Sequence, residues 1–211
     1  MADFVGIAFD LAFKYRNPAI ILADGVIGQM MEKVVLPEQR TRLTDEEVIA
    51  RCPWATTGRT HHRTPNIITS LELDPAEMEK RNIHLQKKYA EIEENEVRFE
   101  ELHCEDAEYL IVAFGSCARI AQKAMEIARE EGIKVGLLRP ITLWPFPSKA
   151  IAARAAQVKG ILTVELNAGQ MVEDVRLAVE CKVPVEHFGR LGGIVPDPDE
   201  VITALKEKLI K

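Results

Sequence analysis

Hydrophobic and polar positions follow three different patterns along the chain, with changes near residues 36 and 105. In the first segment, 1–36, apolar residues recur at helical spacing until Asn17-Pro18 ends the predicted helix. Residues 19–23 are continuously apolar, as in a buried parallel strand that runs into a turn at Asp24-Gly25. One helix and one strand cannot close a core, so this segment is predicted to be the tail of a larger domain or a docking arm.

The second segment, 37–105, is a linker dominated by one long helical pattern. Asp74 is the expected N-cap, Pro75 takes the first helical position and Glu77 follows three residues after the cap. Apolar residues then fall near helical spacing among charged ones, which predicts a connecting helix of about six or seven turns. The members of this stripe are Met78, Leu85, Tyr89, Ile92 and Phe99.

The third segment, 106–211, alternates strands and helices four times, which predicts an α/β domain with a mostly parallel sheet wound by helices. The predicted strands are 108–114, 133–140, 160–166 and 183–188. Gly115 and Gly132 are expected to bound the first helix, Ser116 and Ser148 to cap two helices, and Asp197-Pro198 to begin the last one.

Composition narrows the class of protein. With 47% hydrophobic and 28% charged residues the chain reads as globular, and its net charge of −6 argues against nucleic acid as a partner. No apolar run is long enough to span a membrane, and the N-terminus does not read as a signal peptide. The scattered single cysteines fit a reduced protein, so a cytoplasmic location is expected. The four cysteines form no CxxC and His61-His62 lacks a third ligand nearby, so no metal site is expected on this chain.

Strand-to-helix loops of such a sheet meet at the carboxyl ends of the strands, where ligands usually bind. This rim is predicted to carry a set of polar side chains beside several helix N-termini, which attract anions. The sharper hypothesis is a pocket for a phosphate-bearing ligand, and the favoured one is a contact rim for another subunit. The rim residues are Arg119, Arg139, Glu165, Asn167, Gln170 and Arg190.

Other site motifs are incomplete. The stretch "GRLGG" lacks the spacing and the Lys-Ser/Thr of a P-loop, and Cys117 replaces the second glycine of a GxGxxG motif in "GSCAR". Cys117 beside Arg119 at a helix N-terminus would have a lowered thiol pKa. No histidine lies near it in sequence to act as a base, so a packed cysteine is favoured and no catalytic residue is assigned.

Long stretches of the chain resemble the alpha subunit of 2-oxoacid:ferredoxin oxidoreductases. The resemblance rests on "GSCARIAQKAMEIAREEGIKVGLLRPITLWPFP", "VELNAGQMVEDVRLAVE", "GRLGG", "PWATTG", "HLQKKYAEIEENEVRFEE" and "YRNPAIILADGVIGQMMEKV". It covers essentially the whole chain, and "PWATTG" and "LRPITLWPFP" look most like the branched-chain type, which uses 3-methyl-2-oxobutanoate (2-ketoisovalerate). The 2-oxoglutarate type is a close alternative.

The resemblance implies a subunit of an enzyme that decarboxylates a 2-oxoacid on thiamine diphosphate, passes electrons through iron–sulfur clusters to ferredoxin and forms an acyl-coenzyme A. It implies that residues 106–211 are a transketolase C-terminal-like domain and that 1–36 are a remnant of the domain facing the cofactor's pyrimidine ring. The diphosphate and Mg²⁺ would be held mainly by a beta subunit and the clusters by other small subunits, so this chain alone is expected to be inactive.

The chain departs from the family pattern because it lacks most of the pyrimidine-facing domain, including its activating glutamate. The chain is then a fragment, a misassigned start or one half of a split subunit. A separate hypothesis for its function is a stand-alone interaction module that kept the fold and lost the chemistry. The stretch "AIILADGVIGQM" resembles the thiamine Gly-Asp-Gly signature, but no asparagine follows in the window 49–54, so it is not expected to bind the cofactor's metal. Its bare strand edge could pair with a partner or a second copy as a homodimer.

Overall fold

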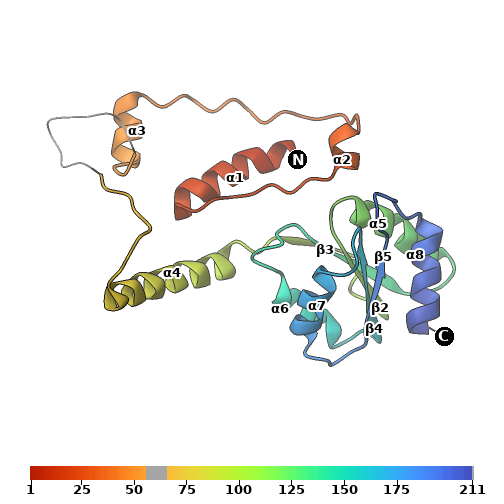
Figure 1. Cartoon of the computed structure of the whole chain (residues 1–211). Coiled ribbons are helices and arrows are strands. Elements are labelled where there is room, and N and C mark those ends of the chain that lie inside the picture. Colours follow the sequence, from red (N-terminus) through yellow and green to blue (C-terminus); the bar gives the residue numbers. More distant parts are fainter. Residues whose placement is uncertain (56–65, 211) are drawn as a thin grey trace. The chain divides into compact units, whose positions relative to one another are not determined.

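The computed structural model describes residues 1–55 and 66–210 (Figure 1). The chain divides into two compact units, one made of Met1–Ile21 and Glu32–Lys88 and the other of Leu22–Met31 and Tyr89–Lys211. The sequence predicted domain boundaries near residues 36 and 105, and these boundaries stay a prediction.

The first unit is built mainly from helices. It contains α1 (Ala2–Tyr15), α3 (Asp45–Arg51) and most of α4 (Pro75–Asn95). The helix predicted before Asn17-Pro18 is confirmed, since α1 ends at Tyr15 with Arg16 in the left-handed conformation. Among the described residues of this unit only Tyr15 and Cys52 are buried hydrophobic ones, so the unit has a very small core of its own.

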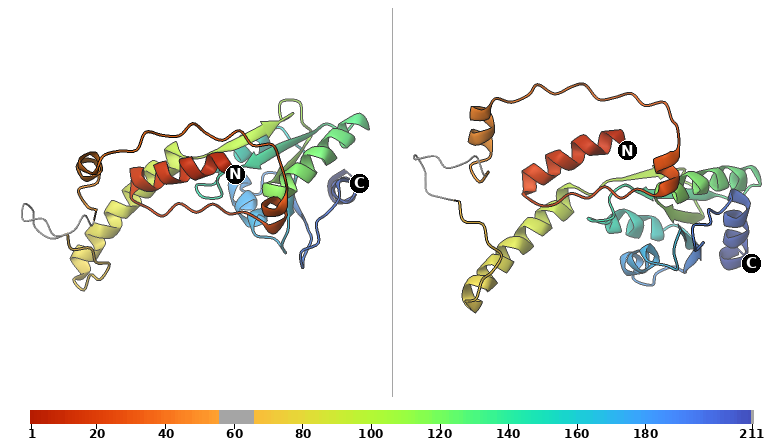
Figure 2. Two further views of the ribbon diagram at one scale, coloured as in Figure 1. Left: turned by 90° about the horizontal axis from the view of Figure 1, so that it is seen from above. Right: turned by 45° about the horizontal axis from the view of Figure 1, so that its top comes forward.

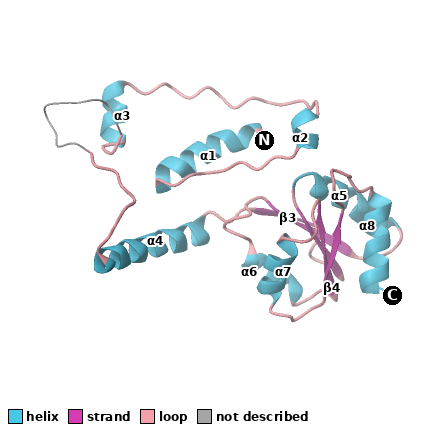
Figure 3. Ribbon diagram, viewed as in Figure 1, coloured by secondary structure: helices cyan, strands magenta, loops and turns pink. Residues whose placement is uncertain are grey.

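The strand predicted over residues 19–23 is wrong. These residues form an unpaired loop, in which Ile20 is 79% exposed, and Asp24 then caps the short helix α2 (Gly25–Gln29) (Figure 3). A strand exists only where a neighbouring strand accepts its backbone hydrogen bonds, and none in the described part of the chain lies beside this run. Apolar composition alone therefore misled the assignment.

The long connecting helix is confirmed, with one correction at its end. Helix α4 spans 21 residues, close to six turns, and Asp74 accepts hydrogen bonds from the amides of Ala76 and Glu77. The predicted stripe extends too far, because Phe99 leaves the helix and begins strand β1 (Phe99–Leu102). The sequence reading missed this strand, since two of its four residues are glutamates.

The α/β fold class is confirmed by a five-stranded sheet in the order β1-β3-β2-β4-β5. Strands β2 (Tyr109–Ala113), β3 (Val135–Pro140), β4 (Gly160–Glu165) and β5 (Val185–Gly189) are parallel to one another. Strand β1 joins the edge antiparallel to β3, with Phe99 opposite Pro140 and Leu102 opposite Leu137. The sheet is therefore mostly parallel, as the four strand–helix repeats predicted.

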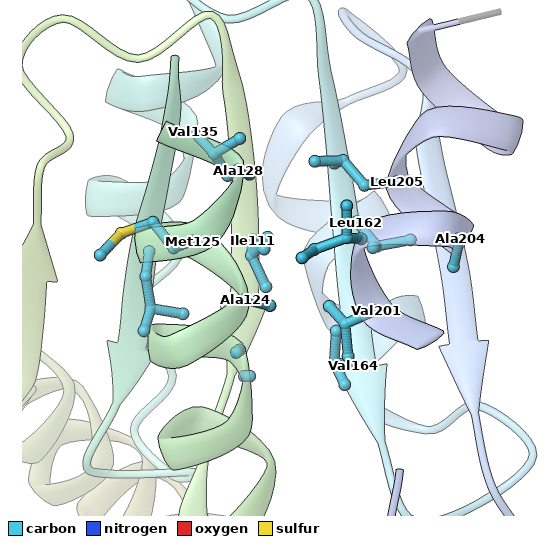
Figure 4. Close-up of a cluster of buried hydrophobic side chains, with 14 of the residues drawn as sticks. Ile111, Ala124, Met125, Ala128, Val135, Leu162, Val164, Val201, Ala204 and Leu205 are labelled. Carbon is cyan, nitrogen blue, oxygen red and sulfur yellow. The ribbon is translucent and has the colours of Figure 1, made fainter. Parts of the chain in front are cut away.

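Helices cover both faces of this sheet (Figures 1 and 2). Helices α5 (Gly115–Glu130) and α8 (Pro198–Leu205) pack on one face, and α6 (Ser148–Ala155) and α7 (Met171–Val179) on the other, while Lys206–Ile210 continue α8 as a π-helical turn. Alternate strand residues divide between the faces: Ile111 and Leu162 point to α5 and α8 (Figure 4), and Leu110 and Ile161 to α6 and α7. Two buried layers thus fix the sheet between its helices.

Helix boundaries agree with the sequence signals except at two caps. Gly115 and Gly132 have the positive φ angles of 57° and 85° that the expected turns require. Helix α8 begins at Asp197-Pro198, as predicted, and Asp197 caps it in a reciprocal pair with Glu200. The prediction of Ser116 and Ser148 as caps is wrong: each is already inside its helix, α5 follows Phe114 and α6 follows Pro147, and neither cap uses a side chain.

Candidate functional site at the carboxyl edge of the sheet

The topological switch point of the sheet lies between the neighbouring strands β2 and β4. Chain order runs outward from β2 to β3 on one side and from β4 to β5 on the other, so the crossover helices α5 and α7 leave from adjacent strands toward opposite faces. Ligands of open α/β sheets bind at such a switch point, outside the carboxyl ends of the strands. This edge is therefore the candidate functional site.

Asp24 lies at this edge, against the beginning of α5. Its Oδ2 accepts a hydrogen bond of 2.7 Å from the Ser116 hydroxyl, and its Oδ1 accepts one of 2.8 Å from the Ile27 amide. Partial burial acts to raise the pKa of Asp24, but the hydrogen bonds from Ile27 and Ser116 outweigh it and hold that pKa below its ordinary value. The carboxylate is thus ionised, and each of its two oxygens accepts a hydrogen bond.

Glu165, at the end of β4, is buried and turned inward. Its carboxylate accepts the amide hydrogens of Gln170, Met171 and Val172 at 2.8–3.1 Å, and so closes the N-terminus of α7 from outside the helix. The His187 Nδ1 lies 3.4 Å from Glu165 Oε1. Glu165, which the sequence placed among the ligand-binding candidates, therefore caps the N-terminus of α7.

The other five predicted rim residues lie on different elements and loops of the domain. Asn167 accepts the Gly169 amide in a tight turn, and Gln170 is the exposed N-cap of α7, so both lie beside Glu165. Arg139 pairs with Glu100 of β1 at 2.7 Å, Arg190 pairs with Glu200 of α8 at 2.7 Å, and Arg119 is exposed on α5. The guanidinium groups of Arg139 and Arg190 are therefore each in an ion pair of their own, and the shared anion site stays a prediction.

Cys117 does not have the lowered thiol pKa that its place beside Arg119 suggested. The residue is 4% exposed, and burial, together with the negative charges of Glu165 and Asp24, raises the pKa of its thiol to about 11. The thiol is therefore protonated at neutral pH. The packed-cysteine interpretation agrees with this environment.

No metal-binding group of three or more His, Cys, Asp or Glu side chains occurs in ranges 1–55 and 66–210. The oxygens of Asp24 are already used by Ile27 and Ser116, so the Gly-Asp-Gly-like stretch does not fit a bound magnesium diphosphate. His61-His62 and the end of "PWATTG" lie outside the described residues. In those same described ranges, no helix is long and apolar enough to cross a membrane.

Residues 107–201 match the family model of the pyruvate:ferredoxin oxidoreductase core domain II. The matched range contains the four parallel strands and the helices α5, α6 and α7. Residues 107–201 are therefore similar to this core domain II, and they are called core domain II here. The resemblance found in the sequence is thereby confirmed, and the switch-point edge described above is the edge of core domain II.

Curated relatives extend the similarity beyond core domain II. The chain is 44% identical over 207 residues to the ketoisovalerate oxidoreductase subunit VorB of Methanothermobacter marburgensis, covering 98% of this chain and 57% of the relative. It is 32% identical over 193 residues to the 2-oxoglutarate synthase subunit KorA of Archaeoglobus fulgidus, covering 90% of this chain and 53% of the relative. The chain thus spans little more than half the length of the curated relatives it matches.

A solved structure agrees with these relatives. It is described as the 2-oxoglutarate:ferredoxin oxidoreductase from Magnetococcus marinus with 2-oxoglutarate, coenzyme A and succinyl-CoA bound. The similarity has a TM-score of 0.60 and 25% sequence identity, and covers 70% of this chain and 28% of that one. Relatives of the chain are therefore subunits of oxoacid oxidoreductases, which are enzymes.

The sequence reading missed Asp24, Ser116 and His187 as residues of this edge. The topology pointed to the loop that contains Ser116, but nothing local signalled that Asp24, 92 positions earlier, would bond to it. His187 falls in a run that reads simply as a strand. Only the register between β4 and β5 brings its ring to Glu165.

Proposed function

We propose that this chain forms part of a subunit of a 2-oxoacid:ferredoxin oxidoreductase that acts on a branched-chain 2-oxoacid, 3-methyl-2-oxobutanoate (2-ketoisovalerate). The observation that carries this proposal is the 44% identity over 207 residues to the ketoisovalerate subunit VorB, against 32% for the 2-oxoglutarate synthase subunit KorA of Archaeoglobus fulgidus. The product would be an acyl-coenzyme A, with the electrons passing to ferredoxin.

Core domain II would contribute structure and assembly surface to that enzyme. Thiamine diphosphate, which supplies the carbanion chemistry of 2-oxoacid decarboxylation, would be held with Mg²⁺ mainly by a beta subunit, and the iron–sulfur clusters by further small subunits. The side chains at the carboxyl edge support this division, since Asp24 and Glu165 are engaged within the chain and no metal-ligand group occurs in the residues that the structure describes.

The carboxyl edge is proposed as a contact rim for another subunit of the complex, with coenzyme A as the alternative occupant. Arg139 and Arg190 are ion-paired within the domain, which leaves less of their charge for a phosphate. The loops that follow these two arginines expose apolar side chains, namely Trp144, Leu191 and Ile194. Large exposed apolar groups rimmed by charged pairs are typical of protein interfaces.

Reconstitution tests the proposal. The chain would be co-expressed with the matching beta and iron–sulfur subunits and with an alpha piece that supplies the part of the relatives' length it does not cover. Purified complexes would be assayed for ferredoxin reduction that depends on both 3-methyl-2-oxobutanoate and coenzyme A. Omitting this chain is the control, and the absence of both a complex and oxoacid-dependent reduction would refute the proposal.

A 2-oxoglutarate-specific enzyme is the second candidate. The structural similarity to the Magnetococcus marinus enzyme and the KorA relatives favour it. The same assay with 2-oxoglutarate as the substrate separates the two, because the branched-chain proposal expects the higher kcat/KM with 3-methyl-2-oxobutanoate. A complex that assembles but reduces ferredoxin with neither acid would instead indicate an interaction module of the same fold.

A further inference from the structure

Residues Leu22–Met31 belong to the compact unit of core domain II, although the chain before and after them belongs to the other unit. Within this stretch α2 lies against α5, and Asp24 makes the 2.7 Å hydrogen bond to Ser116. A ten-residue piece of a long irregular region is thus held on a domain that begins more than sixty residues later in the chain.

Residues Leu22–Met31 are attached to the domain by polar contacts more than by buried apolar side chains. Helix α2 contains no buried residue, and Val26 and Met30 are 42% and 50% exposed. By contrast, the Asp24 carboxylate accepts the Ser116 hydroxyl at 2.7 Å, and Ser116 itself is buried. Hydrogen bonds to an ionised group are worth about twice as much as neutral ones, so this contact dominates the docking of the segment.

The place where Asp24 docks is the first turn of α5, beside the switch point. Gly115 has a φ of +57°, and a Cβ placed there would lie 3.7 Å from Asp24 Oδ2, so the carboxylate lies directly against the start of the helix. The first amides of a helix lack partners inside it. In this chain an internal carboxylate takes the position that an anionic ligand would take in other open α/β sheets.

We propose that residues Leu22–Met31 are a strap that closes the switch-point edge of core domain II, and that the bond between Asp24 and Ser116 is its latch. Because α2 buries no side chain, breaking the latch releases the strap while the sheet and its helices remain folded. The proposal concerns contacts inside this chain and does not depend on the proposed enzymatic function.

Two substitutions separate the latch from other roles of the same residues. Asp24→Asn keeps an N-cap for α2, because asparagine caps as well as aspartate, but removes the charge. Ser116→Ala removes the hydroxyl and leaves the bond from Ile27 to Asp24 in place. Asp197→Asn, at the cap of α8, is the matched control for an Asp-to-Asn change on the same domain.

Amide hydrogen exchange of the whole chain, followed by NMR, measures the opening of the strap. Exchange at the Ser116 amide is expected to be about tenfold faster or more in Asp24→Asn, as follows from losing a charge-assisted hydrogen bond. Exchange at the Ile27 amide is expected to rise in Ser116→Ala, because the released segment frays. The double variant is expected to behave like either single variant, and Asp197→Asn like the wild type at both amides.

Two results would overturn the strap. The first is unchanged exchange at Ser116 and Ile27 in both variants, which would mean that the bond does not hold the segment. The second is an equal rise at the deeply buried Leu110 and Leu162 amides, which would mean that the variants weaken the whole domain instead of releasing a local piece.

Discussion

At the scale of single residues, the carboxylates near the sheet edge accept hydrogen bonds from groups within the same chain. Glu165 is 1% exposed, yet its negative charge is compensated by three backbone amides at the start of α7. A buried ion is tolerated when its hydrogen bonds are complete. Glu165 is therefore expected to matter for folding before it matters for any ligand.

Replacing Glu165 with glutamine tests this role. The amide group of glutamine has one accepting oxygen and would turn its NH₂ toward a helix amide, so we expect the free energy of unfolding to fall by about 2 kcal/mol. Chemical denaturation of the variant and of the wild type measures the change. Glu173→Gln, an exposed substitution on the same helix, should stay within about 0.5 kcal/mol of wild type, and an equal loss in both variants would contradict the assignment.

The buried thiols predict how stability changes at alkaline pH. Burial first, and then neighbouring carboxylates, raise the pKa of both Cys104 and Cys117 from 9.0 to about 11. A group whose pKa is raised by folding binds its proton more tightly in the folded state. Its contribution is complete below the unfolded value and is lost as the pH rises from about 9 to about 11.

Thermal unfolding between pH 8 and pH 11 measures this effect. The melting temperature is expected to fall over that range, and Cys117→Ala should make the fall shallower. Cys181→Ala is the control, because this thiol is exposed in the folded chain. The same slope in all three proteins would contradict a contribution from Cys117.

At the scale of elements, backbone spacing at the sheet edge leaves no room for certain side chains. A Cβ on Gly189, the last residue of β5, would lie 2.2 Å from the Asn167 carbonyl oxygen and 2.6 Å from the His187 ring. The first neighbour is backbone, which cannot turn aside. The end of β5 and the loop after β4 therefore approach each other only because residue 189 is glycine.

Gly189→Ala is expected to lower the free energy of unfolding by about 2 kcal/mol or more, since an inserted methyl group must displace the loop. Gly28→Ala is the matched control: a Cβ there meets nothing within 4 Å, and alanine in a helix should be neutral or stabilise it by up to about 1 kcal/mol. Denaturation of both variants decides the matter. A neutral Gly189→Ala would show that the loop after β4 can move freely.

The elements also show what a sequence can and cannot predict. Strands β2 to β5 and helices α5 to α8 were predictable because their signals are local, namely apolar runs, turn glycines and the Asp197 cap. Strand β1 was not, because its glutamates are compatible with a sheet only through Arg139 and Arg154, which lie about 40 to 50 positions later. The strand predicted over residues 19–23 was wrong for the opposite reason, because an apolar run forms no strand without a neighbouring strand to pair with.

The candidate site follows the same division. Topology placed the loops at the carboxyl edge correctly, but local sequence could not tell which side chains face inward. Glu165 folds back onto its own α7, and Arg139 and Arg190 turn to partners in β1 and α8. Direction of a side chain is decided by contacts formed across the fold, which no local pattern records.

At the scale of the whole molecule, the first unit exposes apolar side chains on α1. Phe4, Phe9 and Phe13 are 36%, 62% and 55% exposed, and further exposed apolar residues follow at 34–36. When several large apolar side chains are exposed, they often mark a contact with another protein or lead to association. A homodimer stays a prediction that this surface makes testable.

The isolated chain is expected to have an average mass above its monomer value of 23.7 kDa, and that mass should rise with concentration. Light scattering coupled to size-exclusion chromatography measures it. Phe9→Glu should reduce the association, whereas Leu177→Glu, at a more exposed apolar position on α7, should not. A constant monomer mass at all concentrations would contradict an adhesive face on α1.

The long separation between Asp24 and Ser116 has a consequence for synthesis. The two residues stand 92 positions apart, so the ribosome needs roughly 5 to 18 s after Asp24 to reach Ser116 at typical elongation rates. The surface that receives Asp24 also requires β4, which is made later still. During that interval residues 22–31 cannot yet form their contacts with α5. Chaperones or a companion polypeptide would meet this segment first, which makes the order of subunit synthesis relevant to how this chain matures.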